Sequence, residues 1–502
     1  MIITKNKYFT LMLVFCMILM FGCGQDNSDP EPVASSTPAP LTETSPSNDS
    51  SAELAIAKTE TSDLLPHQQM AKDFLKELVE IDTTHSTGDA TKAAQAMADR
   101  LIAAGFPRDD VQVLTPVPGK GNLVARYRGK GKDLKPLLLL AHLDVVEANP
   151  ADWEFNPFIF TEKDGYYYGR GSMDDKDEAA IHIANLIRLK EEGYQPTRDI
   201  IVALTADEEG GPHNGAKWLA ENHRDLIDAE YALNEGGGGA MKQGRYLSNA
   251  VQASEKVYQT FTIEFTNSGG HSSLPVKDNA IYHLADALAK IRDYDFPVKL
   301  NEVTHLFFER SAELESGPLR SAMRGVLQSP PDAAAIAFLA DKPFYNSRLR
   351  TTCVATKVNA GHRDNALPQR ANATVNCRVL PGESIDDVEN TLRYVVGDEG
   401  MSIARVTHAN PSSPSPLTPE LLGIMESITE SMWPGVPVIP TMSAGATDAA
   451  FLRNAGIPVY GVSGLFNDIE DNRMHGQNER IEIKTYFEGQ EFLYRLTKQL
   501  TQ

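Results

Sequence analysis

Acidic and imidazole side chains follow several apolar segments of this 502-residue chain, at the points where those segments end. The clearest case is the leucine run at 137–140, after which come Ala141, His142, Leu143 and Asp144. An uninterrupted apolar run predicts a strand buried on both faces of a parallel sheet, with His142 and Asp144 on the same side of it. Such sheets bind ligands beyond the carboxyl ends of their strands. The pair is either a His–Asp hydrogen bond at a strand end or a metal-binding histidine oriented by a carboxylate.

Four further segments end in side chains of the same kind. They are GRGSMDDK with Asp174, DEEGG with Glu208 and Glu209, NEGGGG with Glu235, and MHGQNE with His475. Taken singly, an acid before a helix is commonly an N-cap, and a histidine in a polar loop is commonly only solvated. Taken together, two imidazoles and three carboxylates form a mixture that suits Zn²⁺, with one glutamate to spare.

The order of these motifs resembles a known enzyme family. It is similar to the co-catalytic zinc metallopeptidases that include acetylornithine deacetylase, succinyl-diaminopimelate desuccinylase, carboxypeptidase G and aminoacylase. The resemblance covers the chain from about residue 64 to its end. The phrases RTTC at 350–353, GHRDNALP at 361–368 and NCRVLPG at 376–382 resemble the carboxypeptidase S branch.

The resemblance implies two zinc ions per subunit that share Asp174. The implied ligands are His142, Asp174 and Glu235 for one ion, and Asp174, Glu209 and His475 for the other. Glu208 resembles the general base, and Asp144 is implied to stand behind His142 and orient it. In relatives the peptide between Asp174 and Asp175 is cis.

A second set of residues is implied to act on the substrate. His271 in SGGHSS is either an ordinary turn histidine or, by the resemblance, a residue that reaches the partner subunit's site and stabilises an oxyanion. Asn365 and Arg378 resemble substrate-binding residues, and Arg378 suits a substrate carboxylate through bidentate pairing. Structural roles for both are the alternative.

The elements that must position these residues alternate between strands and helices. That alternation predicts a mixed, mostly parallel sheet sandwiched by helices, as in a zinc-peptidase-like catalytic domain, at 63–253 and again at 409–502. Between them, 254–408 has the order β-α-β-β-α-β and predicts an inserted ferredoxin-like α+β lid and dimerisation domain. This order does not include the partly helical region at 292–350, in which no motif is recognisable.

The N-terminus has the pattern of a targeting segment. Lys5 and Lys7 precede an apolar run that ends at Phe21, and Cys23 after Gly22 resembles the lipobox of a bacterial lipoprotein. Residues 1–23 are thus expected to be a lipoprotein-type signal peptide, with an ordinary signal peptide or an uncleaved anchor as alternatives. The polar, proline-containing stretch at 24–62 predicts a disordered tether. We expect a bacterial cell-envelope protein, periplasmic or lipid-anchored at the outer membrane, with membrane contact only through this segment.

Cys353 and Cys377 flank a turn-like stretch near Asn365. In a hairpin they could face each other, but the sequence does not fix the register, and two buried free thiols are the expectation. The formal net charge of −21 is opposite to the basic footprint of nucleic-acid binding, so we expect no nucleic-acid partner.

These observations predict a zinc-dependent hydrolase that cleaves a peptide or N-acyl amide bond next to a free carboxylate. It would act on peptides or N-acyl amino acids as a carboxypeptidase, dipeptidase or aminoacylase, and form a homodimer through the lid. One alternative is a membrane-tethered peptide-binding protein of the same fold that has lost catalysis, although the complete ligand set argues against it. Another is a different dinuclear hydrolase, such as a phosphoesterase.

Overall fold

The computed structural model describes residues 64–131, 133–407 and 409–502. The expected signal peptide at 1–23, including Cys23, and the expected tether at 24–62 lie outside the described residues. Among the helices that are described, none has the length and the apolar character needed to span a bilayer.

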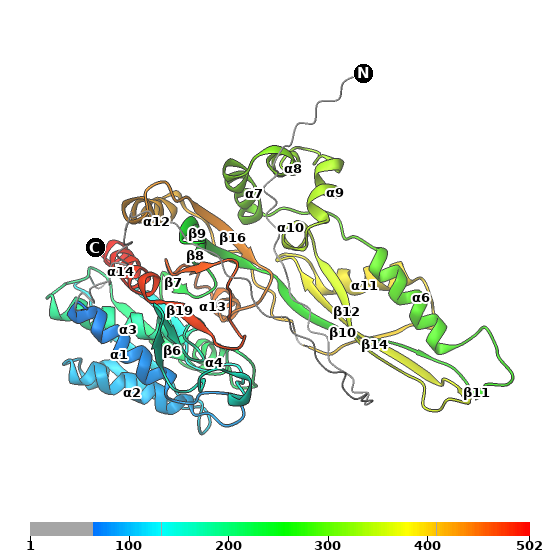
Figure 1. Ribbon diagram of the computed structural model, residues 1–502, viewed down its shortest axis with the longest axis horizontal. Coiled ribbons are helices and arrows are strands. Elements are labelled where there is room, and N and C mark those ends of the chain that lie inside the picture. The colour runs from blue at the N-terminus through cyan, green and yellow to red at the C-terminus, as the bar shows by residue number, and fades with distance from the viewer. Residues whose placement is uncertain (1–63, 132, 408) are drawn as a thin grey trace, which may run out of the picture. The chain divides into compact units, whose positions relative to one another are not determined.

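A mixed sheet of ten strands forms the larger layer, in the order β1-β2-β6-β3-β7-β17-β9-β8-β18, with β16 paired to β9 (Figure 1). The strands are β1 (Val111–Leu114), β2 (Asn122–Tyr127), β3 (Leu137–His142), β6 (Ile200–Thr205), β7 (Tyr231–Asn234), β8 (Gly239–Lys242), β9 (Arg245–Glu255), β16 (Val438–Ser443), β17 (Val459–Gly461) and β18 (Phe466–Asp468). The central run β6-β3-β7-β17 is parallel, whereas β1 and β2 run antiparallel at one edge. The leucine run therefore forms the strand predicted for it, in the middle of the sheet.

Helices cover both faces of this sheet. Leu137 and Leu139 of β3 pack into one core, and Leu138 and Leu140 pack into another, because successive side chains of a strand point to opposite faces. The first core includes α1 (Pro66–Val79), α2 (Ala90–Ala103), α3 (Lys176–Glu191), α12 (Pro419–Met432) and α14 (Ile483–Leu500). The second includes α4 (Gly215–Asn222), α5 (Arg224–Ile227) and α13 (Ala449–Asn454). The predicted α/β class is confirmed.

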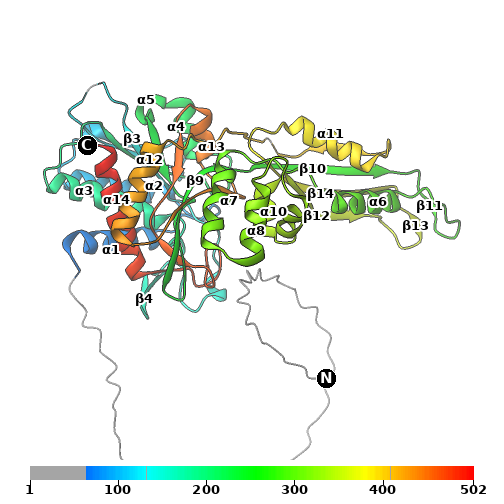
Figure 2. The same ribbon diagram turned by 90° about the horizontal axis from the view of Figure 1, so that it is seen from above.

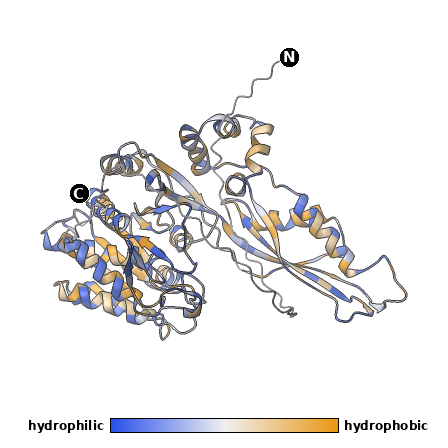
Figure 3. Ribbon diagram, in the orientation of Figure 1, coloured by the Kyte–Doolittle hydropathy of each residue, from blue (hydrophilic) through white to orange (hydrophobic). Residues whose placement is uncertain are grey.

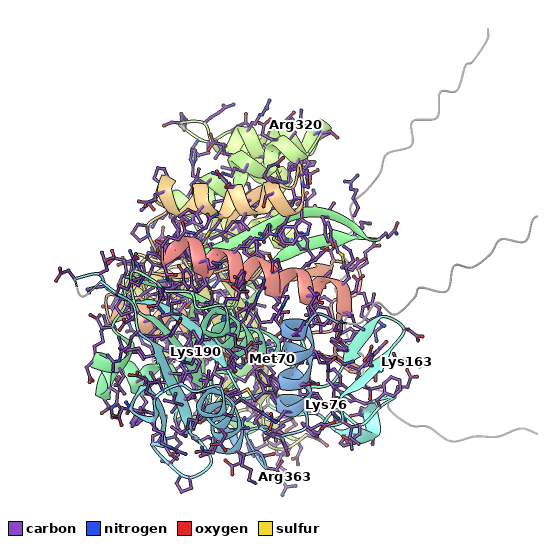
Figure 4. The ribbon with its side chains drawn as sticks, turned by 90° about the vertical axis from the view of Figure 1, so that its left-hand side faces the viewer. Met70, Lys76, Lys163, Lys190, Arg320 and Arg363 are labelled. Carbon is purple, nitrogen blue, oxygen red and sulfur yellow. A yellow bond between two sulfur atoms is a disulfide. The ribbon has the colours of Figure 1, made fainter. Side chains whose placement is uncertain are left out.

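The first and last described helices pack together. Figure 4 shows α1, which carries Met70 and Lys76, next to α14. The Tyr486 hydroxyl of α14 donates a hydrogen bond of 2.9 Å to the backbone oxygen of Ala71 on α1. The C-terminal segment thus completes the layer that the N-terminal segment begins.

A separate sheet of four antiparallel strands has the order β12-β14-β10-β15. Its strands are β10 (Val257–Thr266), β12 (Thr352–Ala360), β14 (Arg370–Val379) and β15 (Ser402–Arg405). Helices α6 (Ala280–Asp293) and α11 (Ile385–Val396) share a core with this sheet, and α6 carries both polar and apolar residues (Figures 2 and 3). This order of strands and helices confirms the predicted ferredoxin-like arrangement.

The region at 292–350 is the part that the sequence left without a motif. It contains α7 (Glu302–Leu314), α8 (Gly317–Val326), α9 (Ala333–Ala340) and α10 (Pro343–Leu349). These helices have a core of their own, which includes Phe308 and Leu339 and also contacts Ile439 of β16. The expected domain boundaries at 253/254 and 408/409 stay predictions.

Smaller elements complete the described fold. A three-stranded sheet has the order β19-β5-β4, and a two-stranded one pairs β11 with β13. Their bounds are β4 (Thr161–Lys163), β5 (Tyr166–Tyr168), β19 (Arg480–Glu482), β11 (Gly270–His271) and β13 (Ala366–Leu367). Two short 3₁₀ helices lie at Arg108–Asp110 and Pro150–Asp152.

Cys353 and Cys377 form a disulfide, so the expectation of two free thiols is wrong. The pairing register of β12 with β14 places the two residues directly opposite each other, with Cα atoms 4.1 Å apart. Directly opposed positions of an antiparallel pair bring the Cβ atoms within reach of a disulfide. The sequence could not supply that register.

Loss of this disulfide should destabilise the four-stranded sheet. The bridge spans 24 positions, and closing a loop of this size in the unfolded chain is worth about 3 kcal/mol. We expect the Cys353→Ser/Cys377→Ser variant to unfold at lower denaturant concentration than the wild type, and a reductant to shift the wild type by the same amount. A reductant that shifts the serine variant equally, or alkylation of Cys353 and Cys377 in the native, unreduced wild type, would contradict the pairing.

Candidate metal centre

The carboxyl ends of three adjacent parallel strands deliver most of the predicted ligands. β3 ends at His142, Glu208 and Glu209 follow the end of β6, and Glu235 follows β7 directly. Asp174 lies two residues before the start of α3. Because β6, β3 and β7 are neighbours and run parallel, their ends meet at one edge of the sheet.

His475 comes from a different kind of element, the loop between β18 and β19. Its Nε2 lies 3.0 Å from Oδ2 of Asp174 and 2.9 Å from Oε1 of Glu209. The other oxygen of Asp174, Oδ1, lies 2.9 Å from Nε2 of His142. Each oxygen of Asp174 therefore faces one imidazole, so this carboxylate could contribute one oxygen to each of two cation sites.

The structure brings all five predicted ligands together. His142, Asp174 and Glu235 form one group, and Asp174, Glu209 and His475 form a second, with ligand atoms within 4.8 Å of one another in each group. Two nitrogen and three carboxylate donors that share one residue fit a pair of cations such as Zn²⁺. The donor chemistry and the shared aspartate thus fit the metal pair that the resemblance implies.

The charges at this centre are unbalanced without cations. Burial opposes ionisation of Asp174, but hydrogen bonds with His142 and His475 hold its pKa well below the usual range. Burial raises the pKa of Glu235 to about 8, with Asp174 and Asp448 adding to the shift against the opposing effect of His142. Hydrogen bonds with Asp174 and Glu209 raise the pKa of His475 to about 10. Bound cations would take over the countercharge that these protons provide.

Asp144 lies next to His142, and its closest contact with the imidazole is made by its backbone. The His142 Nδ1 lies 3.0 Å from the backbone oxygen of Asp144, whereas the nearest carboxylate oxygen of Asp144 is 3.8 Å away. The carboxylate instead accepts hydrogen bonds of 3.0 Å from the backbone N–H groups of Glu208 and Glu209. Asp144 therefore orients the imidazole through its backbone and holds the loop with the two glutamates through its side chain.

Glu208 belongs to neither ligand group. It is partly buried at the same edge of the sheet, one residue before the ligand Glu209. Burial raises the pKa of its carboxyl group well above the usual value, against the effect of His142, and Asp448 and Glu235 add to the increase. A carboxylate that stands beside the ligands but outside both groups is free to accept a proton.

Two contacts at the centre escaped the sequence analysis. Asp175 accepts a 3.1 Å hydrogen bond from the backbone N–H of His142, and the Asp174–Asp175 peptide is cis, as the resemblance implies. Asp448 is buried and accepts hydrogen bonds from the Thr205 hydroxyl and the Asn214 amide. In the sequence Asp448 reads as an ordinary acid before a helix, so no signal separates it from other N-caps.

The three predicted lid residues lie on the smaller sheets. His271 is exposed on β11, and its Nδ1 lies 2.7 Å from the Ser273 hydroxyl. Asn365 is exposed next to β13, and its backbone oxygen accepts a hydrogen bond from Ser272. Arg378 is half-buried on β14, where its guanidinium stands 4.7 Å from the ring of Tyr258. None of the three belongs to either ligand group.

A mixed sheet with two candidate ligand groups at its edge is the arrangement of a dinuclear metalloenzyme. Comparison with known proteins identifies the enzyme family. Residues 138–499 match the description "Peptidase family M20/M25/M40". The chain is 31% identical over 408 residues to "Probable carboxypeptidase S-like 2" of Dictyostelium discoideum, covering 78% of this chain and 77% of that protein. It is also 31% identical over 363 residues to "N-fatty-acyl-amino acid synthase/hydrolase PM20D1" of Xenopus tropicalis, covering 71% and 70%.

The solved structures agree on the fold. The M20 family metallo-carboxypeptidase Sso-CP2 of Sulfolobus solfataricus matches with a TM-score of 0.64 at 18% identity, covering 85% of this chain and 98% of that one. The chain belongs to Peptidase family M20/M25/M40, in its carboxypeptidase S-like branch. The predictions of this family and of an enzyme that hydrolyses C–N bonds are confirmed.

The metal-free protein should lose stability as the pH rises. Between about pH 4.5 and 8 the folded chain keeps a proton on Glu235 that the unfolded chain releases, and between about pH 6.5 and 10 the same holds for His475. The low pKa of Asp174 affects the stability only at acidic pH, where the unfolded chain binds a proton at this residue that the folded chain does not bind. We expect the free energy of unfolding of chelator-treated protein to fall from pH 6 to pH 9, although burial lowers the pKa values of Lys176 and Lys256 to about 7 and both lysines oppose the trend above that pH.

Denaturant unfolding at the two pH values measures this difference. The His475→Ala variant controls for the general effect of the acidic net charge and should show a weaker pH dependence. Saturating Zn²⁺ should abolish or reverse the trend, because cation ligands must be deprotonated. A metal-free wild type that is equally stable at both pH values would contradict the charge distribution described above.

Proposed function

We propose that this protein is a two-zinc hydrolase that cleaves a peptide or N-acyl amide bond adjacent to a free carboxylate. The observation that carries the proposal is the placement of Asp174, whose two oxygens face His142 and His475 separately. Zn²⁺ would be held by His142, Asp174 and Glu235 on one side, and by Asp174, Glu209 and His475 on the other. Bound there, the ions would supply Lewis acidity toward the scissile carbonyl and favour ionisation of water.

Glu208 would perform the proton transfers. Its carboxylate would accept a proton from the attacking water and pass that proton to the leaving amine. Asp144 supports this role because its carboxylate holds the backbone N–H groups of Glu208 and Glu209. The base and the adjacent ligand are thus fixed by one side chain.

Features of the lid and the names of the relatives support the proposed substrate class. Arg378 has a ring neighbour in Tyr258 but no ion pair with a carboxylate among the described residues, so its charge is available to a substrate carboxylate. The names of the relatives refer to a carboxypeptidase and to an N-fatty-acyl-amino acid hydrolase. Both kinds of substrate place an amide bond next to a free carboxylate. Asn365 would assist by hydrogen bonding.

We further propose a homodimer through the four-stranded sheet. β12 is an edge strand of nine residues, and its Val354 and Val358 are 60% and 61% exposed. An exposed edge with apolar side chains is suited to pairing with another chain. His271 would then reach the partner subunit's site and stabilise the oxyanion there. We also propose the bacterial cell envelope as the location, on the N-terminal sequence alone.

Glu208→Gln should abolish turnover while keeping the metal. Loss of a general base costs about 10²–10⁴-fold in kcat/KM, and the amide retains the shape of the carboxylate. Rates on a panel of dipeptides, N-acyl amino acids and phosphate esters, with zinc content measured in the same samples, test this. Glu221→Gln, an exposed change on α4, is the matched control. Faster cleavage of phosphate esters than of amides would favour the phosphoesterase alternative, and peptide binding without zinc would favour a binding protein.

Mixed dimers test the role of His271. His271→Ala and Glu208→Gln homodimers should each be nearly inactive, whereas their mixed dimer has one site with both groups intact. Random mixing after subunit exchange should restore about a quarter of the wild-type activity. Val354→Asp should prevent both dimerisation, seen by light scattering, and this rescue. Activity that stays at the level of the separate variants would contradict the partner-subunit role.

A further inference from the structure

His475 is the ligand that regular secondary structure does not hold. The other ligands follow strand ends or precede a helix, but His475 lies in the loop between β18 and β19. Its backbone has a φ of 60° and that of Asn478 a φ of 53°, both in the left-handed region. The His475 side chain is 50% exposed. Something other than a strand ladder must fix the distance between this loop and Asp174.

A buried ion pair joins that loop to the segment that carries Asp174. Arg170 and Glu479 are 309 positions apart, and their side chains are 3% and 0% exposed. The Nη1 group of Arg170 donates to Oε2 of Glu479, and the backbone N–H of Met173 donates to Oε1 at 2.9 Å. Glu479 thus contacts the residue that precedes Asp174.

Arg170 reaches the backbone of the His475 loop as well. Its Nη2 group lies 3.4 Å from the backbone oxygen of His475 and 3.2 Å from that of Gly476. A third backbone oxygen, that of Glu147, lies 3.5 Å away, and the guanidinium stands 5.1 Å from the ring of Trp153. The planar fork of arginine can bond to a carboxylate and to carbonyl groups at the same time, whereas lysine offers a single point charge.

We propose that Arg170 and Glu479 are positioning residues that fix His475 against Asp174 and so form the second cation site before a cation binds. This inference rests on the proposed two-zinc function. The contacts of Arg170 with the His475 loop belong to one site, whereas the contact of Glu479 with Met173 lies next to Asp174, which both groups share. The group of His142, Asp174 and Glu235 keeps its imidazole on β3, whose position depends on the sheet. The pair should therefore affect the second site more than the first.

Zinc titration against a chromophoric chelator tests this selectivity. In Arg170→Lys and Glu479→Gln, the zinc dissociation constant of the second site should rise by about 10–100-fold, the usual effect of losing a hydrogen-bond partner that orients a ligand, while that of the first site changes little. His475→Ala identifies which constant belongs to the second site. When combined with His475→Ala, Arg170→Lys should have no further effect on the remaining constant. An equal loss at both sites, or an effect that persists without His475, overturns the proposal.

Hydrogen exchange of the metal-free protein gives a readout independent of zinc and activity. Backbone amides at 471–478 should exchange about tenfold faster in Arg170→Lys and Glu479→Gln than in the wild type, since their anchor is lost. Arg453→Lys is the matched control, because Arg453 and Glu255 form an equally buried pair that contacts no ligand. It should leave this segment unchanged, and unchanged exchange in all three variants overturns the proposal.

The two readouts separate this proposal from the proposed function. If the wild type binds no zinc, the two-zinc function is refuted. If the 471–478 segment nevertheless exchanges faster in the two variants, the positioning role still holds. If Glu479→Gln fails to fold, the milder Arg170→Lys variant decides, because it keeps the positive charge and removes the fork.

Discussion

The candidate metal centre depends on several carboxylates that lie close together at a partly buried edge of the sheet. Asp174, Glu208, Glu209 and Glu235 meet at the end of the sheet, and the two candidate ligand groups contain two imidazoles, His142 and His475. Burial and mutual repulsion of like charges disfavour such a cluster, and the raised pKa values of Glu208 and Glu235 are the sign of that cost. A pair of divalent cations removes the cost, so the arrangement is consistent with a centre that is completed by metal.

The sheet makes this concentration of charge possible. Parallel strands β6, β3 and β7 are buried on both faces, and their residues Leu139, Val202 and Leu233 belong to one core. Apolar packing of these strands fixes where their ends lie, and the charged groups follow the last apolar residue of each. The apolar strands thus stabilise the sheet, and the residues immediately after them carry the groups that could bind metal and transfer protons. Asp174 and His475 are the exceptions: Asp174 precedes α3, and His475 lies in a loop that contacts the buried pair of Arg170 and Glu479.

The sequence predicted the large elements from local signals, and it pointed to the five candidate ligands through the resemblance of its motifs to a known family. The leucine run predicts β3, and the order of motifs predicts which acids join His142. Features that depend on register could not be predicted, since Cys353 faces Cys377 only once β12 is aligned with β14. The double use of Asp144, with its backbone toward His142 and its side chain toward the glutamates, also requires coordinates.

Long-range contacts between polar residues are the other class that sequence patterns do not reveal. Arg170 and Glu479 both stood within recognised motifs, yet nothing in either motif indicates that the two side chains meet. Buried charges are rarely left unpaired, so a buried arginine in one motif implies an acid elsewhere, but the identity of that acid is set by the fold. Motif residues that are neither ligands nor bases are therefore candidates for groups that fix the positions of the ligands. In this chain such a pair contacts the loop that carries His475, which neither a strand end nor a helix start positions.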